Sequence, residues 1–192
     1  TIIKQHRAQL LGTMEPWLMV RGLEFARGFV VKGWMKNEVH RAETLPLGPE
    51  WATLEELDFS ENPREAWILA KPALRFLRHA RFGIDGAGQL VDDVPTPIPL
   101  PSLQLHDPYG GETDLDQVAE IVAAKTFANL RTLAIDVGAV RELSAKLAAA
   151  VARSALTCLR VHAATPTKFR APRIAGKRIE LVSSSGRTRV LE

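Results

Sequence analysis

The clearest pattern of apolar and polar positions lies at residues 54–62, which read Leu-Glu-Glu-Leu-Asp-Phe-Ser-Glu-Asn. Apolar residues occupy the first, fourth and sixth positions, and an asparagine stands at the ninth. Successive residues of a strand point to opposite faces, so this spacing buries Leu57 and Phe59 and leaves Asp58 and Ser60 facing outward. The asparagine can bond backbone groups where the chain turns away. The pattern therefore predicts a short, half-buried strand followed by a turn.

Eroded copies of this pattern precede and follow it. The middle apolar residues of successive copies lie 28, 23, 23, 30, 26 and 20 residues apart, close to the period of about 20–29 residues of a leucine-rich repeat. The two clearest helical patterns, at 114–125 and about 140–153, each lead straight into a strand, and this alternation predicts parallel strands. An ordinary leucine-rich α/β domain remains the alternative. The apolar residues expected at the middle of each strand are Phe29, Leu57, Ala80, Leu103, Leu133, Leu159 and Ile179.

We divide the chain as one repeat domain, 1–192. Residues 1–28 are expected to form an N-terminal helical cap, with a helix over 2–21 broken near Pro16, because an open terminal repeat would expose core. Residues 29–164 hold about five to six irregular repeats. Residues 165–192 form a basic C-terminal cap that closes in a strand hairpin. Between repeats, 63–71 fits a short helix, and 83–101 is expected to be a glycine- and proline-rich connection, with a flexible loop at Gly86-Ala-Gly88 and an extended end.

The chain resembles leucine-rich-repeat proteins, and in particular the irregular bacterial ones in which a repeat-companion segment precedes the repeats. The segments that carry the resemblance are Trp17-Leu-Met-Val, Glu24-Phe-Ala-Arg-Gly-Phe-Val-Val, Trp51-Ala-Thr-Leu-Glu-Glu-Leu-Asp-Phe and Phe127-Ala-Asn-Leu-Arg-Thr-Leu. The resemblance covers about residues 10–182, and the companion segment is not found in this sequence. It implies an α/β solenoid with a curved parallel sheet on the inner face, helices and irregular connections on the outer face, and no catalytic residues.

Charge is distributed unevenly. Residues 1–150 carry 16 basic and 20 acidic side chains, whereas 151–192 carry 9 and 2. Such asymmetry can steer a charged partner, or it can reflect solvated loops and a polar cap. No apolar run reaches the about 18 residues of a membrane span, and the start lacks a signal-peptide pattern. The lone Cys158 favours a reducing compartment, so we expect a cytoplasmic protein.

The search for chemistry finds no metal-binding H-E-x-x-H, no paired C-x-x-C and no phosphate-binding G-x-x-x-x-G-K-[ST]. His106-Asp107 resembles a base with its carboxylate, but neighbouring strand residues face opposite sides and no nucleophile is in evidence. Cys158 is expected to be a semi-buried strand residue rather than a reactive thiol. We therefore predict no catalytic residues, no metal and no cofactor.

A repeat fold instead predicts a binding surface, in which the outward residues of successive strands line up in columns. The central column would read Val30, Asp58, Arg81, Gln104, Ala134, Arg160, Glu180, and the next Lys32, Ser60, Gly83, His106, Asp136, His162, Val182. The predicted function is a non-catalytic protein–protein interaction module with an unidentified protein partner. The predicted partner-binding residues are Asp58, Ser60, Arg81, Gln104, His106, Asp136, Arg160 and His162.

Two alternatives stay open. Nine basic residues between Arg153 and Arg189 could bind nucleic acid or another anionic surface, and such binding would be strongly salt-dependent. A hydrolase of unknown type ranks last, and it would need a pocket that gathers His106, Asp136 and His162 around a metal.

Overall fold

The protein forms a single open β-sheet of the α/β class, whose strands are joined by helices, short 3-10 segments and loops. The computed structural model describes residues 6–36, 47–59, 63–107, 113–183 and 185–191. Within these ranges nine strands follow one another across the sheet in chain order. They are β1 Glu24–Ala26, β2 Phe29–Trp34, β3 Glu56–Asp58, β4 His79–Gly83, β5 Ser102–His106, β6 Thr132–Gly138, β7 Cys158–Ala163, β8 Arg178–Val182 and β9 Thr188–Leu191. The predicted α/β class with a mostly parallel sheet is confirmed.

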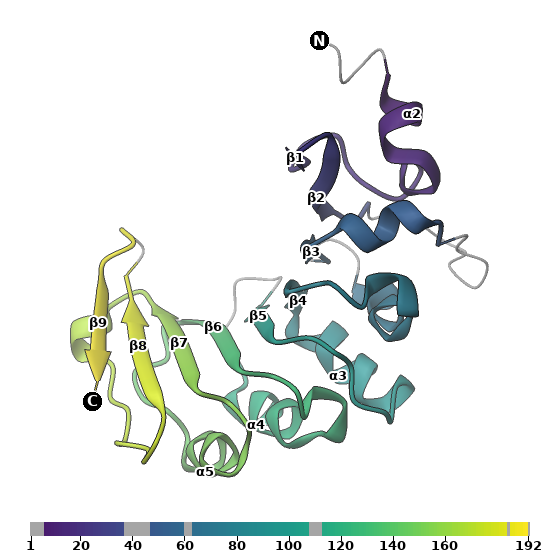
Figure 1. Ribbon diagram of the computed structural model, residues 1–192. Coiled ribbons are helices and arrows are strands. Elements are labelled where there is room, and N and C mark those ends of the chain that lie inside the picture. The colour runs from purple at the N-terminus through teal and green to yellow at the C-terminus, as the bar shows by residue number, and fades with distance from the viewer. Residues whose placement is uncertain (1–5, 37–46, 60–62, 108–112, 184, 192) are drawn as a thin grey trace.

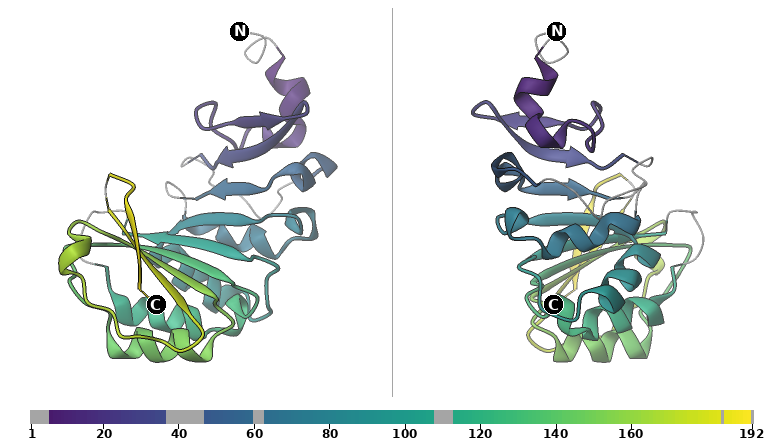
Figure 2. Two further views of the ribbon diagram at one scale, coloured as in Figure 1. Left: turned by 60° about the vertical axis from the view of Figure 1, so that its left-hand side comes forward. Right: turned by 90° about the vertical axis from the view of Figure 1, so that its right-hand side faces the viewer.

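Strands β2 to β8 are parallel, and an antiparallel strand completes each end, β1 beside β2 and β9 beside β8. The helices pack on one face of the sheet, and the sheet bends away from them, so its other face lies inside the bend (Figures 1 and 2). The α-helices are α2 Arg7–Leu11, α3 Ile84–Asp93, α4 Leu115–Ala123 and α5 Ala145–Arg153. Shorter 3-10 segments are η1 Gly12–Met14, η3 Pro49–Thr53, η4 Pro63–Ala70, η5 Pro72–Leu74, η6 Lys125–Phe127 and η7 Pro166–Lys168.

The middle residues of six strands align as the sequence pattern predicts. Leu57, Ala80, Leu103, Leu133, Leu159 and Ile179 are Cα partners from one strand to the next, and each is buried. Because side chains alternate with a period of two, this alignment also fixes which residues of β3 to β8 face away from the core. The predicted closing hairpin of β8 and β9 is confirmed as well.

The prediction for β2 is wrong. Phe29, expected in the core, is 59% exposed, and Gly33 is the residue that pairs with Leu57. Leu18, from the N-terminal segment, fills the space above Gly33: it is fully buried, and a Cβ on Gly33 would lie 2.9 Å from its Cδ1. A distant side chain thus supplies the core contact that the strand itself lacks. In the central predicted column, the β2 position is therefore occupied by Trp34, which pairs with Asp58, and not by Val30, which is buried.

Residues 84–93 form helix α3 rather than the expected flexible loop. Gly86 and Ala87 are buried together with Leu90, so this face of the helix belongs to the core. Glycine costs about 1 kcal/mol relative to alanine inside a helix, a penalty that the burial of one leucine offsets. The end of the same connection, 95–101, is free of helix and strand, as predicted.

The N-terminal helix is shorter than predicted. Of the expected span 2–21, residues 1–5 lie outside the described part, and α2 ends at Leu11. Gly12 follows with a φ of 52°, in the left-handed region, which ends the α-helix before Pro16. Leu11 and Met14 are nevertheless buried in the core, so the segment covers apolar residues as a cap should.

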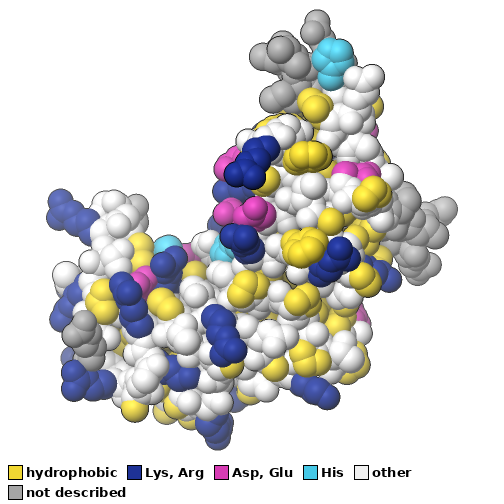
Figure 3. Space-filling model, viewed as in Figure 1, with side chains coloured by type: hydrophobic (Ala, Val, Ile, Leu, Met, Phe, Trp, Pro, Cys, Tyr) yellow, Lys and Arg dark blue, Asp and Glu magenta, His cyan; other side chains and the backbone are white. Residues whose placement is uncertain are grey.

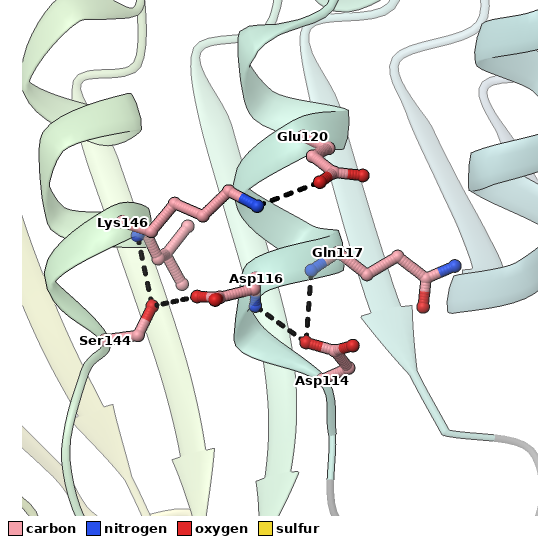
Figure 4. A network of polar contacts seen from close by, with 7 residues as sticks. Asp114, Asp116, Gln117, Glu120, Ser144 and Lys146 are labelled. Atoms are coloured by element: carbon pink, nitrogen blue, oxygen red, sulfur yellow. Dashed lines mark hydrogen bonds and ion pairs between the residues drawn. The ribbon is translucent and has the colours of Figure 1, made fainter.

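Helices α4 and α5 lie where the sequence places them, and each begins at a capping side chain (Figure 4). The Asp114 carboxylate accepts hydrogen bonds from the backbone N–H groups of Asp116 and Gln117, at 2.8 and 3.2 Å. The Ser144 hydroxyl accepts one from Leu147 N–H at 3.1 Å. Each cap satisfies helix-end donors that have no partner within the helix, and α5 therefore starts at residue 145 instead of about 140.

Two polar contacts join α4 to α5 on the outer surface (Figure 4). The Ser144 hydroxyl donates to Oδ1 of Asp116 at 3.0 Å, and Lys146 Nζ lies 2.8 Å from Oε1 of Glu120. The Lys146–Glu120 ion pair is solvent-exposed, so it adds little stability, and the buried apolar residues of the two helices supply most of it.

Two phenylalanine rings stack in the core. The rings of Phe59 and Phe82 are parallel within 9°, with centroids 4.6 Å apart, and both side chains are fully buried. We expect Phe82→Ala to lower the free energy of unfolding by about 3–5 kcal/mol, because it leaves a cavity beside Phe59. Phe76→Ala is the matched control: its ring is 55% exposed, so its loss should cost less than about 1 kcal/mol. Urea unfolding measures both, and equal effects would contradict this packing.

Candidate interaction face

The strand side chains that point away from the helices form a surface that we call the open face. The register of the sheet arranges them in three rows that run across the strands. The middle and last rows correspond to the two columns that the sequence predicts. The first row is Lys32, Glu56, His79, Ser102, Thr132, Cys158 and Arg178; the middle row is Trp34, Asp58, Arg81, Gln104, Ala134, Arg160 and Glu180; the last row is Gly83, His106, Asp136, His162 and Val182. Seven of the eight predicted binding residues lie in the middle and last rows; Ser60 lies outside the described residues.

The first row was missed because the sequence pattern starts each strand one residue too late. In β3 to β8 the residue just before the buried middle residue belongs to the strand and faces outward. The sequence pattern places Lys32 beside Ser60, whereas in the structure Lys32 pairs with Glu56. The sequence does carry a signal for this row, because a polar residue or a cysteine stands at that position in all six strands.

The C-terminal part of the open face is held by one buried carboxylate. Glu180 is only 6% exposed, and its two oxygens lie 2.6 Å from Nε of Arg160 and 2.8 Å from Nε of Arg178. The hydrogen bond to Glu180 raises the pKa of Arg160, which stays charged. Charge-assisted pairs of this kind are strong, so these side chains already satisfy one another.

The N-terminal part carries looser pairs. Lys32 Nζ lies 3.2 Å from the carboxylates of both Glu24 and Glu56, and these hydrogen bonds, that of Glu56 first, raise its pKa. Arg81 Nη1 lies 3.5 Å from Oδ2 of Asp58. All of these are cross-strand neighbours of opposite charge, which is the favourable arrangement for adjacent strands.

A hollow of about 160 Å³ opens on this part of the face, between β2 and β5. Charged groups of both signs border it, and the Trp34 side chain supplies an aromatic wall. In Figure 3 the same inner side of the bend shows acidic, basic and histidine side chains close to one another. The residues that line the hollow are Lys32, Trp34, Glu56, Leu57, Asp58, His79, Arg81 and Gln104.

Two histidines lie near the hollow. His79 Nδ1 lies 2.9 Å from the Ser102 hydroxyl, and burial lowers its pKa. His106 is 9% exposed; burial first, and then the positive charge of Arg81, lower its pKa. Nδ1 of His106 and Nε of Arg81 are buried and have no hydrogen-bond partner among the described residues. The N-terminal part of the face therefore has unsatisfied polar atoms that the Glu180 part does not have.

Asp136, in the last row, contacts Gln104 of the middle row and His162 of its own row. Oδ2 of Asp136 lies 3.3 Å from Nε2 of Gln104, and Oδ1 of Asp136 lies 3.8 Å from Nδ1 of His162. Within the described ranges, no three His, Cys, Asp or Glu side chains gather in a way that could hold a metal ion. The residues named for the hydrolase alternative do not form the ligand cluster it requires. Cys158 is half-buried, and burial raises the pKa of its thiol, which disfavours the reactive thiolate.

Several charges of the basic C-terminal segment already have partners within the protein. Arg160 and Arg178 bind Glu180, and Lys177 Nζ donates to the backbone carbonyls of Ser154 and Leu156, both at 2.7 Å. Other exposed basic residues, among them Arg153, Lys168, Arg170, Arg187 and Arg189, come from a helix end, a connection and the terminal hairpin. No helix in the described part of the chain is long and apolar enough to cross a membrane.

Comparisons of the chain with protein-family models, with curated proteins and with solved structures found no significant match. No relative therefore assigns a role to any residue of the open face. What the protein does has to be inferred from the rows, the ion pairs and the hollow described above.

The Glu180 cluster can be tested by removing its charge. Glu180→Gln keeps the shape of the side chain but leaves two guanidinium groups without a carboxylate, so we expect the free energy of unfolding to fall by about 1–3 kcal/mol. Glu120→Gln removes the carboxylate of the exposed pair with Lys146 and should have no measurable effect. Urea unfolding of both variants at low and high salt gives the answer. Equal stability of the two variants would contradict a structural role for Glu180.

His79 and His106 make the stability of the protein depend on pH. The pKa of each in the folded protein lies below the ordinary 6.5, so each binds a proton more readily in the unfolded chain than in the folded protein. Stability is therefore complete above about pH 6.5 and is lost as the pH falls below it. Unfolding free energies measured from about pH 7 to about pH 5 should decrease, and His106→Gln should weaken that decrease. An unchanged profile in this variant would rule out a contribution from His106.

Proposed function

We propose that this protein is a leucine-rich-repeat solenoid that acts as a non-catalytic interaction module and binds a protein partner with its open face. The chain-order strands, their parallel register and the helical connections on one face support the solenoid. The intervals of 20–30 residues between aligned middle residues support it too. A curved, helix-free face of polar rows is the surface that such folds offer to partners.

The observation that carries this proposal is the hollow between β2 and β5. Its lining combines a tryptophan with an arginine, two of the residue types that dominate binding hot spots. Nε of that arginine, Arg81, is buried without a hydrogen-bond partner among the described residues, and a docked group could relieve this cost through a small side-chain shift. By contrast, Arg160 and Glu180 at the other end are already paired. We therefore assign the anchor point of the partner to the Trp34 and Arg81 region.

A charge swap tests the assignment without removing an ion pair. Asp58→Arg combined with Arg81→Asp keeps opposite charges in contact but reverses their positions in the middle row. The matched control is Glu120→Lys with Lys146→Glu, which reverses an exposed pair on the helix side. Each immobilised protein is exposed to a lysate of the source organism, and the captured proteins are compared by mass spectrometry.

The proposal expects at least one protein that the unaltered chain and the Glu120/Lys146 control capture and that the Asp58/Arg81 swap loses. Thermal unfolding of the variants, followed by circular dichroism, establishes that all three are folded. Identical capture by all three would overturn the open face as the working surface.

Nucleic-acid binding through the basic C-terminal segment is the second candidate. The observation in its favour is that Lys168, Arg170, Arg187 and Arg189 are all exposed. Phosphate contacts would make such binding fall steeply with salt. A titration with generic DNA and RNA at low salt decides it, and absence of binding there eliminates this candidate.

A further inference from the structure

Within the described residues, the C-terminal edge of the sheet is strand β9. This strand pairs only with β8 and stands last in the strand order of the described residues. Its first three residues are exposed and Leu191 is partly exposed. An edge strand of this kind presents backbone N–H and C=O groups to which another extended chain can pair.

The register shows which side chains an added strand would meet. Val190 pairs with Glu180 and therefore lies on the open face, where it is 37% exposed; Arg189 pairs with Leu181 and lies on the helix side. A hollow of about 570 Å³ adjoins the end of β9. Its lining is apolar at Ile174, Val190 and Leu191 and basic at Arg173, Lys177 and Arg178.

Charge determines which chain can pair here. Arg187 and Arg189 are exposed, and residues 151–192 carry nine basic against two acidic side chains. A second copy that paired through its own β9 would bring these arginines against each other, which is unfavourable between adjacent strands. An acidic strand would place carboxylates beside them. The same arginines thus protect the edge from self-association and select for negative charge.

We propose that β9 is a second interaction surface, which accepts an extended acidic segment of a partner protein as an additional strand of the sheet. Backbone hydrogen bonds along the strand provide the pairing. Contacts of alternate carboxylates with Arg187 and Arg189 provide the selectivity. This surface does not depend on the open face, since neither arginine lies in its rows.

Three labelled peptides test the proposal with the full chain. The first alternates Glu with Val and Thr, the second carries Lys in place of Glu, and the third keeps every Glu but has proline at alternate positions. Proline removes backbone donors and leaves the charge unchanged, so the third peptide separates strand pairing from simple electrostatic attraction. Fluorescence anisotropy measures binding, and amide hydrogen exchange measures protection of residues 188–191.

The expected result is binding of the acidic peptide alone, with slower amide exchange in β9. Arg187→Glu with Arg189→Glu should abolish that binding and permit the Lys peptide instead. Arg153→Glu, at the end of α5, is the control and should leave binding unchanged. The Asp58/Arg81 swap should also leave it unchanged, so the failure of one interaction surface does not imply the failure of the other.

Three outcomes would overturn the proposal. Equal binding of the proline peptide would mean electrostatic attraction without strand addition. Slow exchange, in the protein alone, of the β9 amides that point away from β8 would mean that a second copy or another part of the chain already covers the edge. Absence of binding by the acidic peptide would mean that the arginines only protect the edge.

Discussion

The structure depends on one constraint: six consecutive parallel strands bury their middle residues in register. Leu57, Leu103 and Leu133 belong to this buried row, and each is at most 1% exposed. A shift of one residue in any strand would turn its apolar side chains to water and its charges into the core. The alignment that protects the core therefore also fixes the rows of the open face.

Once the rows are fixed, adjacent strands place opposite charges side by side. At β7 and β8 this arrangement encloses Glu180 between two arginines and leaves little for a partner to bind. Between β2 and β5 the pairs are longer, a hollow opens, and Trp34 lies at its border. One surface thus contains a self-satisfied part and an unsatisfied part, and the difference between them supports the choice of anchor region.

The ends of such a sheet raise a separate problem, because a stack of strands always leaves two edges. At the N-terminal end the apolar side chains of α2 and η1 cover the core beside β2. At the C-terminal end a hairpin adds β9, whose exposed arginines make the edge unfavourable for a second copy. The two ends therefore differ in their chemistry: the edge strand β1 carries Glu24, which pairs with Lys32, whereas the edge strand β9 carries the exposed Arg189.

The sequence by itself determined the period-two burial, the intervals between strands, the parallel order, helices α4 and α5, and seven of the described outward residues. These depend on contacts between positions that the local pattern already aligns. It did not determine that Leu18 fills the space over Gly33, that Gly86 and Ala87 belong to a helix, or that Lys32 pairs with Glu56. Tertiary structure decided these three features, because each depends on which distant side chain occupies a given space. Local periodicity carries no information about such distant contacts.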